Sequence, residues 1–197
     1  MIEIRLYVEG HPRLHVGFQA FLTEIREAAR ARGIKWNLTM GHGQVARDFM
    51  KALRKHPDAW NVLLLDSEGP DDGRLLDSLR ERKDWTPPSG MRVRDGQVCW
   101  MVQLMESWFL ADRTALRQFY GDGFSEAPLP GNPQVEQAPK NDVLNGLKSA
   151  TRNSRPGEYR KSAHAPKILA LLSVQRVRDA APNCRRLFAS MIERISS

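Results

Sequence analysis

The chain has 197 residues, of which 41% are hydrophobic and 27% are charged, and its formal net charge is +7. This length suits one domain, or one domain with an appendage, that can bury a sizeable core. No apolar run approaches the ~20 residues of a membrane span, which argues against a membrane protein.

The chain starts directly on a strand-like run, MIEIRLYVEG, with no basic, apolar and small-residue pattern of a signal peptide. We therefore expect a cytoplasmic protein. The two cysteines, Cys99 and Cys184, have no Cys or His neighbour at metal-finger spacing. They are predicted to be buried thiols rather than a disulfide or a zinc site.

Strand-like and helix-like segments alternate in the first half of the chain. Apolar periodicity predicts strands at 2–9, 35–40, 61–65 and 97–105, and helices at 16–31, 44–55 and 71–85. The continuous apolar run NVLLL is typical of a strand covered on both faces. This order predicts an α/β core over 1–110, with a mostly parallel four-stranded sheet flanked by helices.

The second half has helical patterns and no strand pattern. Helices are predicted at 107–120 and 141–152 and around CRRLFASMIERI, with a Pro/Gly-rich excursion at 121–140. Asp112 is a candidate N-cap for RTALRQF, and Asn141 or Asp142 for the helix at 141–152. We expect residues 111–197 to form a helical, basic C-terminal extension packed on the core.

Positive charge is concentrated in that extension. Residues 1–110 contain 16 Lys/Arg and 15 Asp/Glu, whereas residues 111–197 contain 14 and 8. One stretch carries six basic residues against the single acid Glu158, namely Lys148, Arg152, Arg155, Arg160, Lys161 and Lys167. Such a stretch favours a nucleic-acid partner. A solvated basic loop explains the charge equally well.

Carboxylates follow three of the predicted strands. Glu9 follows the first, Asp66 and Glu68 follow the strand at 61–65, and Glu106 follows the last. Because parallel strands bring their carboxyl ends to one edge of a sheet, these acids should gather where open sheets bind ligands. Carboxylate oxygens suit Mg²⁺ or Mn²⁺, so the pattern predicts a metal site at this edge.

Each acid also has an ordinary structural interpretation. Glu9 could be a solvated strand end, because strand ends are usually polar. Asp66 or Ser67 could cap a following element. Glu106 could be a first-turn acid favoured by a helix dipole. Of the four, Glu9 and Asp66 carry most of the metal-site prediction.

The strand ending in Glu-Gly and the later strand ending in Asp-x-acid resemble the TOPRIM domain of topoisomerases, bacterial primases and OLD-family nucleases. More closely, the chain is similar to a family of small TOPRIM-like bacterial proteins of unknown function, through the run VEG…LLLDSEGP…MVQLMESWFLAD…GLKSATRNSRPGEYRKSAHAPKIL. Those proteins are often encoded beside AAA/ABC-type ATPases in defence gene clusters. The first likeness covers about 110 residues, and the second covers nearly the whole chain.

The resemblance implies roles for particular residues. Glu9 matches the TOPRIM glutamate, a metal ligand or general acid/base, and Asp66 matches the first aspartate of the Asp-x-Asp pair. Glu68 stands where that pair has its second aspartate. The longer glutamate side chain could still bind metal, but with an altered reach. Glu106 lies in the small family's own Met-Glu-Ser-Trp motif, and its role as a further metal ligand is an extrapolation from that family. Lys161 and His164 lie in the small family's basic segment and could contact phosphate or act in acid/base catalysis.

His164 has an independent case, because it is predicted to begin the helix APKILALL, whose N–H groups would attract an anion. A surface histidine in a basic loop is an equal alternative.

We therefore expect a nuclease dependent on Mg²⁺ or Mn²⁺, with Glu9, Asp66, Glu68 and His164 as catalytic residues. Glu9, Asp66, Glu68 and Glu106 would hold the metal, and the six basic residues would hold DNA or RNA. By resemblance, it would be the effector of an ATPase-controlled anti-phage system. The alternative is a non-catalytic subunit that binds the ATPase or nucleic acid. The sequence leaves the oligomeric state open.

Overall fold

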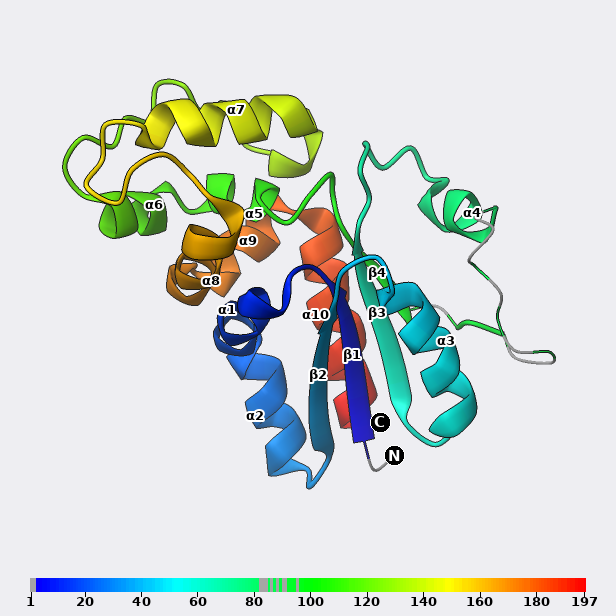
Figure 1. The fold of residues 1–197 in the computed structure, drawn as a ribbon. Helices are drawn as coiled ribbons and strands as arrows, with labels where there is room; N and C mark the ends of the chain where they lie inside the picture. The colour runs from blue at the N-terminus through cyan, green and yellow to red at the C-terminus, as the bar shows by residue number, and fades with distance from the viewer. Residues whose placement is uncertain (1–2, 82–84, 86, 88, 90–91, 95) are drawn as a thin grey trace.

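Four parallel strands in the order β2-β1-β3-β4 form the centre of the molecule in the computed structural model (Figure 1). The structure describes residues 3–81, 85, 87, 89, 92–94 and 96–197. Within these residues the strands are β1 (Glu3–Glu9), β2 (Lys35–Gly41), β3 (Trp60–Asp66) and β4 (Val98–Met101). The prediction of an α/β fold with a parallel four-stranded sheet is confirmed.

Helices connect and flank these strands. In the first half they are η1 (Pro12–Leu14), α1 (His15–Phe21), α2 (Thr23–Ala31), α3 (Val45–Lys55) and α4 (Leu75–Arg80). In the second half they are α5 (Ser107–Ala111), α6 (Arg113–Tyr120), η2 (Val135–Gln137), α7 (Lys140–Thr151), α8 (Lys161–Leu171), α9 (Val174–Ala180) and α10 (Pro182–Ser196).

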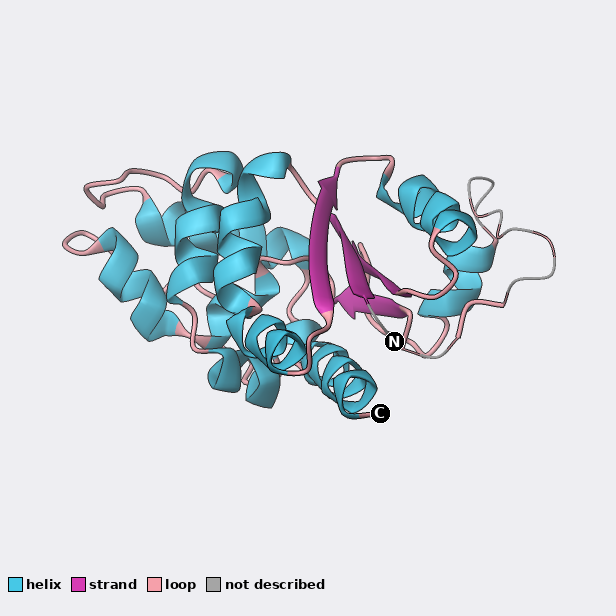
Figure 2. Ribbon diagram, turned by 90° about the horizontal axis from the view of Figure 1, so that it is seen from below, coloured by secondary structure: helices cyan, strands magenta, loops and turns pink. Residues whose placement is uncertain are grey.

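Helices cover both faces of the sheet, as expected for parallel strands joined by helical crossovers. Helices α1, α2 and α10 lie on one face, and α3 and α4 on the other (Figures 1 and 2). Alternate residues of β3 face opposite ways, so Leu64 packs toward α1, α2 and α10, whereas Leu63 and Leu65 pack toward α3. This explains why the NVLLL run is apolar at consecutive positions.

The helical second half shares its core with the first half. Phe21 of α1 stacks on Trp108 of α5 with ring centroids 5.0 Å apart, and its edge meets Phe188 of α10 at 5.8 Å. Helices α5 to α9 gather toward the carboxyl ends of the strands, with α8 packed beside α1 (Figure 1). These helices are therefore placed to contribute side chains to the carboxyl edge of the sheet.

Several predicted boundaries are wrong. The helix predicted at 16–31 is interrupted at Leu22, and the strand predicted at 97–105 ends at Met101, level with the end of β3 at Asp66. The helix predicted at 71–85 covers only Leu75–Arg80, and residues 82–84 of that prediction lie outside the described residues. Helix α7 has Pro139 at its N-cap position rather than Asn141 or Asp142.

Asp112 separates α5 from α6, and its side chain accepts a hydrogen bond from the Ala115 N–H. The capping prediction for Asp112 is therefore confirmed, although the helix predicted at 107–120 is two helices.

Both cysteines are buried and unpaired, as predicted, and burial raises the pKa of the Cys99 thiol to about 12. In the part of the chain that the structure describes, none of the helices has the length and apolar character needed to cross a membrane.

Candidate functional site at the carboxyl edge of the sheet

Asp66 is the last residue of β3, and its side chain ties that strand to the segment after β4. Its Oδ1 accepts a 2.8 Å hydrogen bond from the Met105 N–H. The backbone N–H of Ser67 donates to the Met101 carbonyl at 3.2 Å, and that of Glu68 donates to the Gln103 carbonyl at 2.8 Å. The segment that carries Glu106 therefore contacts both the Asp66 side chain and the backbone of the two residues that follow it.

Lys161 joins Asp66 to Glu106. Its Nζ lies 3.6 Å from Oδ2 of Asp66 and 3.1 Å from Oε2 of Glu106. Glu106 is completely buried, and its other oxygen, Oε1, accepts a 2.9 Å hydrogen bond from the Tyr159 hydroxyl. Three distant segments, the end of β3, the residues after β4 and the start of α8, therefore meet at one point.

Burial and neighbouring charges set the protonation of this cluster. Burial raises the pKa of Asp66 to about 7, with further increases from the Glu106 and Glu9 carboxylates, while Lys161 and the Met105 N–H oppose the rise. The pKa of Lys161 is raised, because attraction to Glu106 and Asp66 outweighs the effect of its own burial. The pKa of Asp66 therefore lies near neutral pH, whereas the Lys161 ammonium beside it stays charged.

Glu9 ends β1, the strand next to β3, and follows Val8, which pairs with Leu64. The Glu9 carboxylate contributes to the raised pKa of Asp66, so the two acids are within electrostatic reach of each other. The predicted grouping of strand-end acids thus includes Glu9, Asp66 and Glu106.

Glu68 pairs with Lys140 and makes no hydrogen bond or ion pair with Asp66, Glu106 or Lys161 among the described residues. Its backbone has φ of 63°, a left-handed conformation that is uncommon for a residue with a side chain. Its carboxylate forms an ion pair with Lys140, at the start of α7, and its side chain is 62% exposed. Glu68 therefore lies at the solvent side of the edge, bridged to the helical half of the chain.

His164 is buried inside α8 rather than at the start of that helix. Helix α8 begins at Lys161, so the prediction that His164 begins it is wrong. Its Nδ1 lies 3.0 Å from the Tyr120 hydroxyl, and its ring contacts those of Phe119 and Tyr159. Burial and the charges of Arg160 and Lys167 lower its pKa, which keeps the ring neutral at pH 7.

The six predicted nucleic-acid-binding residues are all exposed, on α7, α8 and the segment between them. Arg152 forms an ion pair with Glu158 at 3.7 Å, and Lys161 pairs with the buried acids. No ion pair with a described carboxylate involves Lys148, Arg155, Arg160 or Lys167. The structure therefore leaves positive charge on the surface of α7, α8 and the segment between them.

The carboxylates of the edge match a divalent cation in their chemistry. Asp66 and Glu106 already share one cation, the Lys161 ammonium, and Glu9 adds negative charge nearby. No group of three or more His, Cys, Asp or Glu side chains among the described residues is arranged as a complete metal site. Mg²⁺ is commonly held by one or two protein carboxylates together with water and substrate phosphate.

Two residues of this region were not predicted. Tyr159 donates to Glu106, and Lys140 pairs with Glu68. Neither stands in a recognisable local motif, although Tyr159 lies inside the basic segment, two residues before Lys161. Their roles follow from contacts 53 and 72 positions apart in the chain.

Comparison with curated proteins and with solved structures found no match for this chain. One protein family does match: the model described as a domain of unknown function (DUF4276) aligns with residues 15–192. That span includes Asp66, Glu68, Glu106 and the whole basic segment, and leaves out Glu9. The chain therefore belongs to the DUF4276 family.

Proposed function

We propose that the carboxyl edge of the sheet is the active site of a metal-dependent nuclease, a phosphodiesterase acting on DNA or RNA. The observation that carries this proposal is the meeting of Asp66, Glu106 and Lys161 from three distant segments. Buried titratable groups with perturbed pKa values, gathered at the ligand-binding edge of an α/β sheet, are typical of catalytic sites.

Asp66 and Glu106 would hold the metal, with Glu9 as a third contributor and Glu68 at the outer edge. When bound, Mg²⁺ or Mn²⁺ supplies activation of water and charge stabilisation at the leaving oxygen. The two carboxylates fit such an ion because they already converge on one positive charge.

The protein's own groups would position the reacting atoms. Asp66 would be ionised when it holds the metal, because a bound cation favours the carboxylate form. Tyr159 orients Glu106 through its hydroxyl, and Lys161 supplies a positive charge beside the place where a phosphate would sit. His164 is held by Tyr120 and supports the packing of α8.

The exposed basic residues of α7, α8 and their connection would hold the substrate backbone. Lysine and arginine contacts to phosphates give affinity with little dependence on base sequence. The substrate would therefore be recognised mainly as a polyanion. The resemblance to small defence-associated proteins extends the proposal to a cytoplasmic effector controlled by an AAA/ABC-type ATPase encoded nearby.

A second candidate function is a non-catalytic subunit that binds the ATPase or nucleic acid. It is favoured by the same Lys161, because its ammonium neutralises Glu106 and Asp66 without any metal. In that case the cluster would be a structural clamp between the sheet and α8.

A nuclease assay separates the two functions. Single- and double-stranded DNA and RNA would be incubated with the protein and Mg²⁺ or Mn²⁺, with and without the ATPase. Metal-dependent cleavage should fall by at least about a hundredfold in Asp66→Asn and Glu106→Gln, because each removes a metal ligand. Asp122→Asn, at an exposed position, is the matched control and should cleave normally.

Cleavage that persists unchanged in folded Asp66→Asn and Glu106→Gln would overturn the assignment of the active site. Substrate binding without cleavage in every combination of metal and ATPase would favour the non-catalytic subunit.

A further inference from the structure

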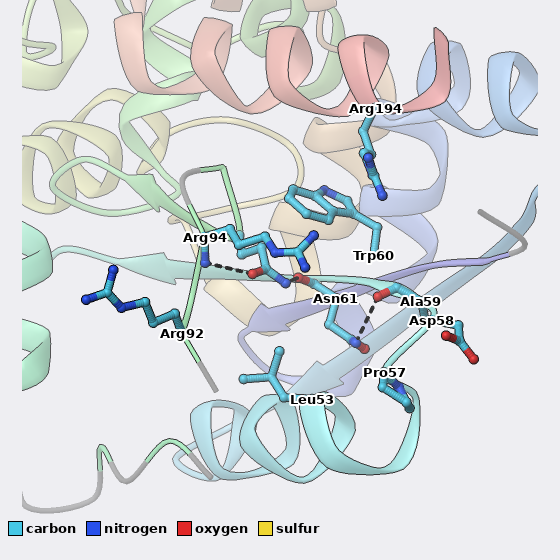
Figure 3. A pocket seen from close by; sticks show the side chains of 10 residues that line it. Leu53, Pro57, Asp58, Ala59, Trp60, Asn61, Arg92, Arg94 and Arg194 are labelled. Carbon is cyan, nitrogen blue, oxygen red and sulfur yellow. Dashed lines mark hydrogen bonds between the residues drawn. The ribbon is translucent and has the colours of Figure 1, made fainter. Parts of the chain in front are cut away.

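A basic pocket lies at the edge of the sheet opposite the acidic cluster, where β3 and β4 begin. It has a volume of about 330 Å³ and is lined by Trp60 and Asn61 of β3, Gln97 before β4, and three arginines, Arg92, Arg94 and Arg194 (Figure 3). Asp58 is the one acid among the described residues of the lining. Trp60 and Asp66 are six residues apart on β3, so the two edges are separated by ~20 Å.

Arg94 is held in place by a buried glutamine. The Gln97 side chain accepts a 2.8 Å hydrogen bond from the Arg94 N–H and donates one of 3.0 Å to the Asn61 carbonyl. The Gln97 N–H also donates to the Arg94 carbonyl at 3.1 Å. The turn that presents Arg94 is thus fixed to the first residues of β3.

The same turn packs closely against the last helix. Gly96 has φ of +79°, and a Cβ there would lie 3.1 Å from Cβ of Ser190 on α10. Arg194 is one helical turn beyond Ser190, and its guanidinium lies over the Trp60 ring at 4.9 Å. In Figure 3 the side chains of Arg94 and Arg194 both extend into the space beside Trp60.

Among the described residues, two arginines of this pocket have no carboxylate partner and several of its polar atoms have no hydrogen-bond partner. No carboxylate among the described residues forms an ion pair with Arg94 or Arg194. The Nε of Arg194, the indole N–H of Trp60 and Oδ1 of Asn61 are buried without a hydrogen-bond partner in the described chain. Buried polar groups are usually satisfied, so unsatisfied ones at a pocket call for an occupant.

We infer that this pocket binds the phosphate group of a small phosphorylated molecule, either free phosphate or a mononucleotide. Guanidinium groups bind phosphate through paired, charge-assisted hydrogen bonds, and Arg94 and Arg194 come from separate elements that the fold holds together. Asn61 Oδ1 would accept a hydrogen bond from a donor on the ligand. The pocket is distinct from the acidic edge and does not depend on the function proposed there.

Calorimetric titration of the 197-residue chain with inorganic phosphate and with adenosine 5′-monophosphate tests the inference. The ionic strength is held constant, and a titration with chloride in place of the ligand is the blank. Saturable binding of at least one probe is expected, and the ratio of the two affinities identifies the source of the phosphate. Arg94→Ala and Arg194→Ala should each weaken binding by about tenfold or more, because each removes charge-assisted hydrogen bonds.

Two controls bound the result. Arg30→Ala removes the same charge from an exposed position on α2 and should change the affinity less than about twofold. Asp66→Asn should also bind the phosphate probes with normal affinity, because Asp66 lies at the other edge of the sheet. Loss of phosphate binding at this pocket can therefore be distinguished from loss of nuclease activity at the acidic edge. Absence of saturable binding, or equal affinities for Arg94→Ala, Arg194→Ala and Arg30→Ala, would overturn the inference. Arg194→Lys keeps the positive charge and the helix but removes the guanidinium group. If this folded variant binds the ligand more weakly than the wild type, the loss of affinity is due to the missing guanidinium and not to unfolding.

Discussion

The ammonium group of Lys161 lies 3.1 Å from Oε2 of Glu106, although the two residues are 55 positions apart in the chain. Glu106 is completely buried, whereas the Lys161 side chain is 42% exposed. This ion pair connects the start of α8 to the segment that follows β4. It is also the point at which the basic part of the chain reaches the acidic edge of the sheet.

Replacing Lys161 with Met should lower the free energy of unfolding by about 3 kcal/mol. The substitution leaves Glu106 buried without its cation, which typically costs 3–5 kcal/mol, and the partial exposure of Lys161 favours the low end of that range. Urea unfolding at pH 7 measures the change. Lys148→Met, at an exposed position on α7, is the matched control and should alter stability by less than ~0.5 kcal/mol. Equal effects of the two substitutions would contradict a structural role for the pair.

Tyr159→Phe should lower the free energy of unfolding by about 1–2 kcal/mol, because Glu106 Oε1 loses its buried hydrogen-bond donor. The edge-to-face contact of this ring with Phe109 at 6.2 Å should remain. A double-mutant cycle with Glu106→Gln measures the coupling between the two side chains. A coupling energy indistinguishable from zero would show that the hydrogen bond contributes nothing to stability.

Gly17→Ala should destabilise the fold by about 2 kcal/mol through overpacking. A Cβ at Gly17 on α1 would lie 2.5 Å from the Pro166 carbonyl oxygen on α8, so the two helices would have to move apart. Alanine is otherwise a better helix former than glycine, so the expected loss has the opposite sign to the change in helix propensity. Thermal unfolding, with Gly131→Ala at an open loop position as control, measures the difference. Stabilisation by Gly17→Ala would show that α1 and α8 are not closely packed.

The contribution of His164 to stability should fall as the pH is lowered through about 6.5, the ordinary pKa of histidine. Asp66 acts in the opposite direction, because its pKa is raised to about 7 in the folded state and it binds a proton there before the unfolded chain does. The folded state lowers the pKa of His164, so the unfolded chain binds a proton at this residue more readily in that range. The contribution of the neutral His164 ring to stability is fully present above the pKa of histidine in the unfolded chain. It is lost as the pH falls toward the lower pKa of the ring in the folded state. The groups facing the ring are Tyr120, Tyr159, Arg160 and Lys167.

An NMR titration of the His164 ring measures its pKa directly, and urea unfolding at pH 7.5 and 5.5 measures the linked stability. Because glutamine does not titrate, His164→Gln should remove the contribution of this ring: the free energy of unfolding at pH 7.5 minus that at pH 5.5 should be smaller in the variant than in the wild type. A folded-state pKa at or above 6.5 would be incompatible with the buried, neutral ring.

Much of the architecture could be predicted because the relevant signals are local. The continuous apolar run at 61–65 and the alternation of strand and helix patterns determined the parallel sheet with two covered faces. The polarity change at the end of each strand also placed Glu9, Asp66 and Glu106 near one edge. Element boundaries were harder, because the end of β4 at Met101 depends on where its neighbour β3 ends.

Only the tertiary structure decided which partners these side chains have. Lys161 was predicted as a contact for nucleic acid, yet it lies between Asp66 and Glu106, and His164 packs among aromatic rings. The pocket formed by Arg94, Arg194 and Trp60 has no local signature, since its residues come from a turn, a helix end and a strand start. The physical reason is that charge, burial and pKa depend on neighbours distant in the chain, whereas periodicity and polarity are properties of adjacent residues.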